Sequence, residues 1–280
     1  MPLLPKSIYL LALVFTCAQA KSANIPPSVG NETDWCKVLS GDLMSVDLQK
    51  CSSYSWNFEG TASMKGSVIP FLKWGNEKGK KIMILGSMHG DEISSVSLAF
   101  RWIDLMQSSN SDSELRKYNY WIVPLVNPDG YFTRPRTRTN ASGVDLNRNF
   151  RSKRWELDAL SEWKKKAHSD PRSFPGKTSG SEKETILMEK WIEEFNPDLI
   201  ISIHAPYNLI DHDGPVLLPK AKSPLKIKTL GAFPGSLGQF AGVEKSIPVI
   251  TVELAEAKKM PDANMIDMLL EFVVKSKKKE

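Results

Sequence analysis

Cysteine and histidine are scarce in this chain, which has three cysteines and four histidines among 280 residues. So few cysteines exclude a small protein built on a dense disulfide framework. The chain also lacks a large excess of one charge, because 37 basic residues are offset by 32 acidic ones. The basic residues are spread along the chain. A nucleic-acid-binding protein needs a denser basic patch, so no nucleic acid partner is expected.

Long apolar runs are absent after the amino terminus. Near that terminus, Lys6 precedes the apolar run 8–15, and the small residues Ala18 and Ala20 follow. A basic start, an apolar core too short to span a bilayer and a small-x-small site predict a secretory signal peptide over residues 1–20. We therefore expect an exported protein, periplasmic or secreted, with no membrane span.

The cysteines fit this expectation. Cys36 and Cys51 remain after the signal peptide, and in an oxidising compartment a pair that closes a short loop is a candidate disulfide worth about 2–3 kcal/mol. Two free thiols are the alternative. Cys17 suggests a lipoprotein instead, which ranks lower because bulky Phe15 and Thr16 precede it.

Four segments divide the chain by composition. Residues 1–20 are the signal peptide, and residues 21–66 form a lead-in that begins rich in Pro, Ser and Asn and carries the cysteine pair. Residues 67–275 are expected to form the main folded domain. Residues 276–280 are a basic tail, expected to fray from the last helix.

The domain is organised around the apolar run 81–88, which ends in His89-Gly90-Asp91-Glu92. A bounded apolar run followed by an amphipathic segment predicts a buried strand, a loop and a helix. His89 and Glu92 then lie at the carboxyl end of a strand, where open α/β sheets place their chemistry. Imidazole and carboxylate are good zinc ligands, although a His-x-x-Glu spacing also arises by chance.

Three further runs predict buried strands. Residues 118–126 precede an Asn-Pro-Asp-Gly turn, residues 199–203 end at His204, and residues 247–252 end at Glu253. Glu253 on its own is as compatible with a solvated loop residue as with a buried one. Strands that alternate with helices predict one α/β domain with a mixed, mostly parallel sheet flanked by helices on both faces.

The helices and loops between these strands are also predictable. Residues 156–167 and 181–195 are expected as helices, the second with a capping box of Ser181 and Glu184. Residues 68–75 predict an edge strand, because Pro70 cannot donate to a ladder. The long polar loop 133–150 is either disordered or functional.

Two histidines stand outside the strand ends. His168 lies in a polar stretch and is expected on the surface. His212 lies in the block Leu209-Ile210-Asp211-His212-Asp213-Gly214-Pro215, predicted as a loop close to the candidate site.

Five blocks together resemble the zinc carboxypeptidase family, in the same order and with similar separations across residues 68–254. They are His89-Gly90-Asp91-Glu92, Asn127-Pro128-Asp129-Gly130, Gly143-Val144-Asp145-Leu146-Asn147-Arg148-Asn149-Phe150, His204 after its strand, and Thr251-Val252-Glu253-Leu254. Five blocks in order are far more specific than any one of them.

The resemblance implies a role for each matching residue. His89, Glu92 and His204 would be the ligands of one Zn²⁺ per chain, and Glu253 the general base that takes a proton from the attacking water. Arg138 would stabilise the oxyanion, although Arg134 and Arg136 lie close enough to confuse the alignment. Asn147 and Arg148 would hold the terminal carboxylate of a substrate, and Asp145 would orient His89.

Within that family the chain looks most like the murein peptide amidases, which cut the γ-D-glutamyl–diaminopimelate bond of peptidoglycan peptides. His204-Ala205-Pro206, the 210–215 block and Pro234-Gly235-Ser236-Leu237-Gly238 suggest this subgroup. The expected function is therefore a zinc peptidase or amidase, with a cell-wall muropeptide as substrate.

Three alternatives stay open at this point: a general exported metallocarboxypeptidase, an aspartoacylase-like deacylase, and a peptide-binding relative without metal. The side-chain pocket is unassigned apart from Tyr207 as a candidate. Exo- versus endo-type cleavage and the oligomeric state do not follow from any motif.

Overall fold

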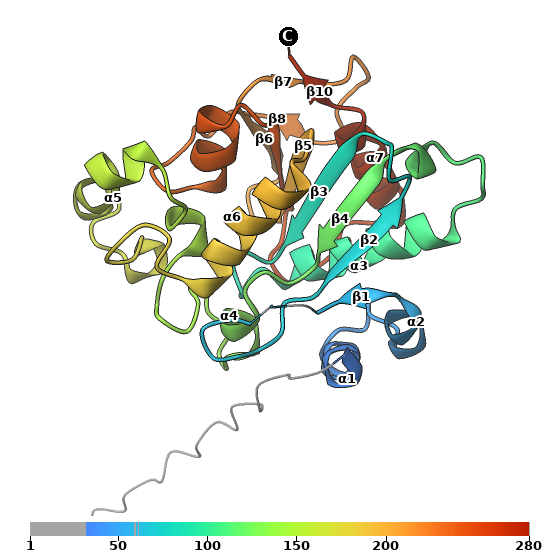
Figure 1. Ribbon diagram of the computed structural model, residues 1–280, viewed down its shortest axis with the longest axis horizontal. Coiled ribbons are helices and arrows are strands. Elements are labelled where there is room, and N and C mark those ends of the chain that lie inside the picture. Colours follow the sequence, from blue (N-terminus) through green and yellow to red (C-terminus); the bar gives the residue numbers. More distant parts are fainter. Residues whose placement is uncertain (1–31, 59, 61, 280) are drawn as a thin grey trace, which may run out of the picture.

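The computed structural model describes residues 32–58, 60 and 62–279, so the expected signal peptide lies outside the described residues. Eight strands form one mixed sheet in the order β1-β2-β4-β3-β5-β9-β6-β8, with helices against both faces (Figure 1). The predicted fold class is confirmed. No helix of the described part is long and apolar enough to cross a membrane.

The large sheet contains β1 (Trp56–Asn57), β2 (Phe71–Gly75), β3 (Lys81–Gly86), β4 (Asn119–Val123), β5 (Leu199–His204), β6 (Leu209–Asp213), β8 (Lys226–Ile227) and β9 (Val249–Glu253). A separate antiparallel pair joins β7 (Val216–Leu217) and β10 (Lys277–Lys278).

The α-helices are α1 (Glu32–Asp42), α2 (Leu48–Ser53), α3 (Ile93–Ser108), α4 (Pro128–Phe132), α5 (Lys153–Lys165), α6 (Lys183–Phe195) and α7 (Ala263–Val274). Three short 3₁₀ turns, η1 (Glu114–Lys117), η2 (Leu146–Arg148) and η3 (Pro171–Ser173), and a π-helical turn, η4 (Gly238–Glu244), complete the described elements.

Two apolar cores lie on opposite faces of the sheet, because side chains alternate along each strand. On β3, Ile82 and Ile84 face the core formed with α1, α3 and α7, whereas Met83 and Leu85 face the core formed with α6. A side chain of this kind contributes about 1.5–3 kcal/mol when fully buried. The central strands are therefore apolar on both faces, as the uninterrupted run 81–88 predicted.

Strand register brings the candidate residues to one edge of the sheet. β4, β3, β5 and β9 run parallel, and the pairing sets Gly86 beside Ile203 and His204 beside Glu253. The loops that leave β3 and β5 therefore start at the same edge, next to the end of β9.

Cys36 and Cys51 form a disulfide bond that joins α1 to α2. Trp35 packs on Trp56, with ring centroids 4.7 Å apart, and on Phe100 of α3, at 5.6 Å. The lead-in thus packs on the face of the sheet that carries α3 and α7, with α1 and α2 side by side near β1 (Figure 1).

Two local expectations differ from the structure, and one open alternative is decided. Pro70 precedes β2 and is not within it, and β1 pairs outside β2, so β2 is not the edge strand. The capping box is wrong: α6 begins at Lys183, the Ser181 hydroxyl donates to the Glu182 carboxylate, and Glu184 is buried elsewhere. The long loop 133–150 is ordered, and its Val144, Leu146 and Phe150 are buried.

The basic tail also differs from the expected frayed end. β10 pairs with β7, the Lys279 amide donates to the Pro215 carbonyl at 2.7 Å, and Ser276 is fully buried. The Lys80 ammonium donates to the Ser276 carbonyl. Backbone pairing with β7 holds this segment although its sequence is strongly basic.

A buried carboxyl group links the lead-in to α6. Glu184 has no exposed surface, and it accepts hydrogen bonds from the Met64 amide at 3.1 Å and from Asn140 Nδ2 at 3.2 Å. Burial raises the pKa of Glu184 to about 7, and the nearby Asp129 carboxylate acts in the same direction. The folded state therefore binds a proton at Glu184 over a range where the unfolded chain has released it.

We predict that this group makes the folded protein less stable as pH rises from about 4.5 to about 7. In that window the unfolded state binds fewer protons than the folded state, so the free energy of unfolding falls, by about 1–3 kcal/mol for this shift. Urea unfolding of wild type and Glu184→Gln at pH 5 and pH 8 measures it, since the variant should lose that part of the pH slope. Glu114→Gln on the exposed surface is the control, and equal slopes in all three proteins would contradict the assignment.

Candidate metal centre and active site

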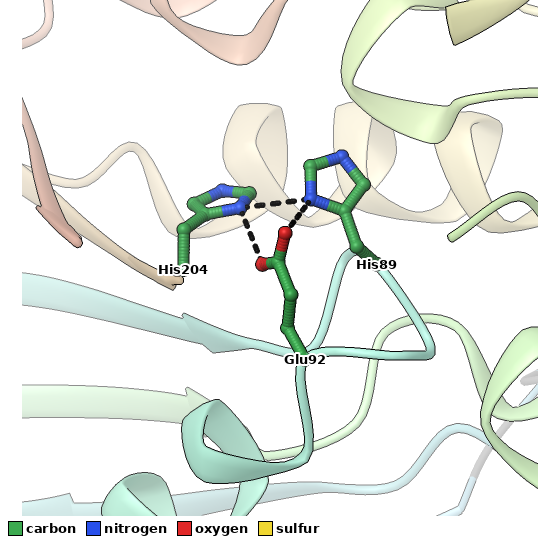
Figure 2. Close-up of side chains that lie close together, drawn as sticks. All are labelled: His89, Glu92 and His204. Carbon is green, nitrogen blue, oxygen red and sulfur yellow. Dashed lines mark hydrogen bonds and ion pairs between the residues drawn. The ribbon is translucent and has the colours of Figure 1, made fainter. Parts of the chain in front are cut away.

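Three side chains converge where β3 and β5 end. His89 follows β3, Glu92 stands directly before α3, and His204 is the last residue of β5 (Figure 2). All three are at most 4% exposed. The loop after β3 turns tightly between His89 and Glu92. Their side chains therefore both point toward His204, on the neighbouring strand β5.

The facing atoms of these residues are those that bind metals. His89 Nδ1 lies 2.8 Å from Glu92 Oε1, and His204 Nδ1 lies 3.1 Å from Glu92 Oε2 and from His89 Nδ1. Ligands bound at 2.0–2.1 Å around a tetrahedral zinc ion lie roughly 3.3 Å apart, so this spacing fits the ion. Two imidazoles and one carboxylate also form a ligand set typical of catalytic zinc.

Neighbouring groups orient both imidazoles. His89 Nε2 lies 3.0 Å from Asp145 Oδ1, and His204 Nε2 lies 2.9 Å from the Ser202 hydroxyl. A carboxylate at Nε2 requires the imidazole proton there, which leaves the Nδ1 lone pair of His89 free for a metal. Asp145 therefore occupies the orienting position that the family resemblance implied.

Neighbouring groups hold the buried carboxylates in their ionised form. Burial would raise the pKa of Glu92, but the two imidazoles hold it well below its usual range. Burial also opposes the charge on Asp145, yet Arg138 and His89 hold the pKa of Asp145 far below the ordinary value. Both carboxylates are thus anions across the physiological range.

Glu253 lies at the end of β9, beside His204, and differs from these carboxylates. It is 7% exposed, and its Oε2 atom has no hydrogen-bond partner among the described residues. Burial raises the pKa of Glu253 above its usual value. A buried carboxylate oxygen without a partner, facing a cavity, suits a group that exchanges protons with substrate or water.

The structure separates the three arginines of the long loop. Arg138 Nε donates to Asp145 Oδ2 at 3.0 Å, and its Nη1 lies 3.3 Å from Glu92 Oε1. Arg134 and Arg136 instead form ion pairs with Asp42, at the end of α1. Of the three, Arg138 alone lines the active-site cavity.

Asn147 and Arg148 also line the cavity. Asn147 Oδ1 accepts the Leu237 amide at 2.9 Å, and the Arg148 guanidinium stacks on the Phe233 ring at 4.3 Å. Arg148 also donates to the Asn147 carbonyl at 2.7 Å, but it forms no ion pair within the described part of the chain. A stacked guanidinium without a carboxylate partner is free to bind an anionic ligand.

The cavity that holds these residues has a volume of 540 Å³ and extends well beyond the metal centre. Its lining also includes Asp211 and Asp213 on β6, Phe233, and the exposed ring of Tyr207. Tyr207 was expected as a pocket residue. The other predicted residues, His89, Glu92, Arg138, Asn147, Arg148, His204 and Glu253, line the cavity as well.

Asp213 and Phe233 were not predicted as site residues. Asp213 has no hydrogen-bond or ion-pair partner among the described residues, and burial, with the neighbouring Asp211, raises its pKa to about 6. The sequence feature that could have identified Asp213 is the 210–215 block, which was predicted as a loop with His212 close to the site. His212 instead lies within β6 and does not line the cavity, and His168 is exposed.

Comparison with known proteins gives a consistent result. Residues 49–211 match the sequence model of the family described as zinc carboxypeptidase. Murein peptide amidase A of Escherichia coli (strain K12) is 33% identical over 181 residues, which cover 61% of this chain and 69% of that protein.

Two crystal structures share the fold. The murein-tripeptide amidase of Escherichia coli O157 superposes with a TM-score of 0.51 at 22% identity, over 77% of this chain and 90% of that one. Carboxypeptidase A from Helicoverpa armigera superposes with a TM-score of 0.58 at 18% identity, over 86% of this chain and 68% of that one.

We predict that Asp145→Asn lowers zinc affinity about 10–100-fold, because the amide no longer fixes the His89 tautomer that presents Nδ1 to the ion. Competition with a chelator measures the dissociation constant directly. Asp213→Asn is the matched control, since Asp213 lines the same cavity without contacting a candidate ligand. An unchanged affinity in Asp145→Asn would show that the tautomer is set elsewhere.

Proposed function

The chain belongs to the zinc carboxypeptidase family, and from this premise we propose that it hydrolyses the γ-D-glutamyl–meso-diaminopimelate bond of peptidoglycan-derived peptides. The family and the curated relatives make the protein a hydrolase. The observation that carries the proposal is one cavity that holds the His89, Glu92 and His204 cluster, the Glu253 carboxylate with its unpartnered Oε2 atom, and an Arg148 guanidinium that pairs with no carboxylate among the described residues.

His89, Glu92 and His204 would hold the zinc ion. When bound, zinc supplies Lewis-acid chemistry, which polarises a carbonyl and makes water a better nucleophile at neutral pH. Glu253 would accept a proton as water attacks the scissile carbonyl carbon, and would pass that proton to the leaving amine as the carbon–nitrogen bond breaks. Its burial and raised pKa support this role.

Arg138 would stabilise the oxygen on which negative charge develops. Its Nε and Nη1 atoms are held by Asp145 and Glu92, so the guanidinium is fixed before the substrate arrives. A preorganised positive group needs little rearrangement in the transition state, and this is the main source of its effect.

The cavity offers opposite unpaired charges to the leaving amino acid. Arg148 and Asn147 would bind its carboxylate next to the cleaved bond. Asp213, which lines the same cavity, would accept a hydrogen bond from an ammonium group at the end of a long side chain. Diaminopimelate carries both groups, whereas a neutral carboxyl-terminal residue leaves Asp213 without a partner.

The expected export supports a cell-wall substrate, since such an enzyme meets the wall or its released peptides. The Cys36–Cys51 disulfide is consistent with an oxidising compartment. We therefore propose a periplasmic or secreted location.

The decisive experiment is mass spectrometry of products formed from L-Ala-γ-D-Glu-meso-diaminopimelate by the zinc-loaded protein, beside peptides with ordinary carboxyl termini. Zinc-dependent release of free diaminopimelate is the expected result. Trimming of ordinary peptides alone would make the protein a general metallocarboxypeptidase. Cleavage of N-acyl amino acids, with neither peptide class cut, would favour a deacylase.

We predict that Glu253→Gln retains zinc and lowers kcat by at least about 100-fold, because glutamine cannot accept the proton of the attacking water. Metal analysis and kcat on the same preparation check both parts. Glu256→Gln alters an exposed glutamate three residues away that does not line the cavity, and should keep full activity. Appreciable turnover in Glu253→Gln would place the base elsewhere.

We also predict that Asp213 acts on one class of substrate, whereas Arg148 acts on both. Asp213→Asn should raise KM about 10-fold or more for peptides ending in diaminopimelate and leave peptides ending in alanine unchanged, because only the former lose a charge-assisted hydrogen bond. Arg148→Ala should raise KM for both. Equal effects of Asp213→Asn on both substrates would remove it from side-chain recognition.

A further inference from the structure

We propose that Asp42 is a positioning residue: it clamps the arginine loop, defined here as residues 133–139, and so holds Arg138 in the active site. The kinetic part of this inference rests on the proposed role of Arg138. The clamp itself can be tested without any substrate.

Asp42 uses its two carboxylate oxygens on two arginines. Oδ1 accepts Arg134 Nη2 at 3.0 Å, and Oδ2 accepts Arg136 Nη2. The Asp42 side chain is 25% exposed and that of Arg136 is 20% exposed, so the pair is partly shielded from water. One carboxylate thus bridges positions two residues apart in the loop and prevents them from moving independently.

Each arginine is also held from a second side. Arg134 Nη1 donates to the Tyr131 carbonyl at 2.7 Å, and the Arg136 guanidinium lies 4.6 Å from the centre of the Tyr131 ring. Asp42 is nevertheless the only carboxylate that pairs with either of them within the described residues. Without it, two unneutralised guanidinium groups would stand next to Arg138 in sequence and repel each other.

Arg138 turns the other way. Its side chain reaches Asp145 and Glu92, while its carbonyl accepts Asn127 Nδ2 at 3.1 Å. The three arginines of the loop therefore pair with carboxylates at two places. Arg134 and Arg136 pair with Asp42. Arg138 pairs with Asp145 and Glu92 at the candidate metal centre. A shift of the first two would pull the backbone that carries the third.

Asp42 lies on a helix that is held in place by a disulfide bond and by core packing. It ends α1, which the Cys36–Cys51 disulfide joins to α2 and which buries Trp35 and Leu39 in the core shared with α3. The family match begins at residue 49, so α1 lies outside it. The lead-in layer thus adds a support for the catalytic arginine that the matched part of the chain does not contain.

Limited trypsin digestion tests the clamp directly, because the loop contains the bonds Arg136–Thr137 and Arg138–Thr139, whereas proline protects the bond after Arg134. Asp42→Asn should raise the rate of cleavage at these two bonds at least about fivefold, as local opening becomes easier. Asp104→Asn is the matched control: Asp104 ties the same layer through Lys50 and Tyr54 but does not touch the loop. Equal cleavage in wild type and Asp42→Asn, or equal acceleration in Asp104→Asn, would overturn the clamp.

A double-mutant cycle tests whether the clamp acts through Arg138. Asp42→Asn should lower kcat roughly tenfold, with KM and zinc content within about twofold of wild type, since small misplacements of a catalytic group are costly. Asp42→Glu should recover most of the activity. In the Arg138→Ala background the same Asp42→Asn change should have less than a twofold effect.

The outcomes separate the proposals. A tenfold loss from Asp42→Asn in the Arg138→Ala background as well, or a loss that follows zinc content, would overturn action through Arg138. If the proposed substrate is not cut at all, the proposed function fails, and the digestion pattern still decides whether Asp42 clamps the loop.

Discussion

The parallel pairing of β3, β5 and β9 is the constraint on which the site depends. It places His204 beside Glu253 and sets the end of β3 one residue from His204, so a candidate ligand and the candidate base share one sheet edge. A slip of one residue would turn every side chain to the other face and separate them. Gly90 adds to this constraint, because a Cβ atom there would overlap the backbone of Gly130.

Charge alternates along a chain of contacts that starts at the sheet edge. His204, Glu92, His89, Asp145 and Arg138 follow one another, each within 3.1 Å of the next. Such alternation makes the burial of two carboxylates tolerable, since each faces a group of opposite or switchable charge. Three groups of the same cavity stand outside this alternation: Glu253, Arg148 and Asp213. Groups that the protein leaves uncompensated in a cavity are those a substrate would compensate, and for this reason they carry the functional proposal.

The sequence correctly predicted those features that depend on residues close together in the chain. The run 81–88 and the residues after it predicted the strand, the turn and the positions of His89 and Glu92, because apolar periodicity depends on near neighbours. Ser181 and Glu184 had an equally local motif, and it failed because Glu184 is recruited by Met64 and Asn140, which are distant in sequence. The pairing of β10 with β7 was hidden for the same reason, since a basic sequence does not reveal a partner about 60 residues earlier. Asp213 was part of a block that carried the resemblance, yet its proposed role depends on a cavity lining that forms only when β6 packs beside β9.

The arginine loop shows what the fold adds to a motif. Arg134, Arg136 and Arg138 have the same chemistry and even spacing, so nothing in the loop itself distinguishes them. Their difference comes from two carboxylates on distant parts of the chain, Asp42 before the loop and Asp145 after it. A guanidinium is always charged, so each arginine in a partly buried loop needs a carboxylate partner. Asp42 pairs with Arg134 and Arg136, which leaves Arg138 to pair with Asp145 at the candidate metal centre. On the proposed roles of Arg138 and Asp42, the disulfide-pinned layer thus helps to select the arginine that acts at the candidate metal centre.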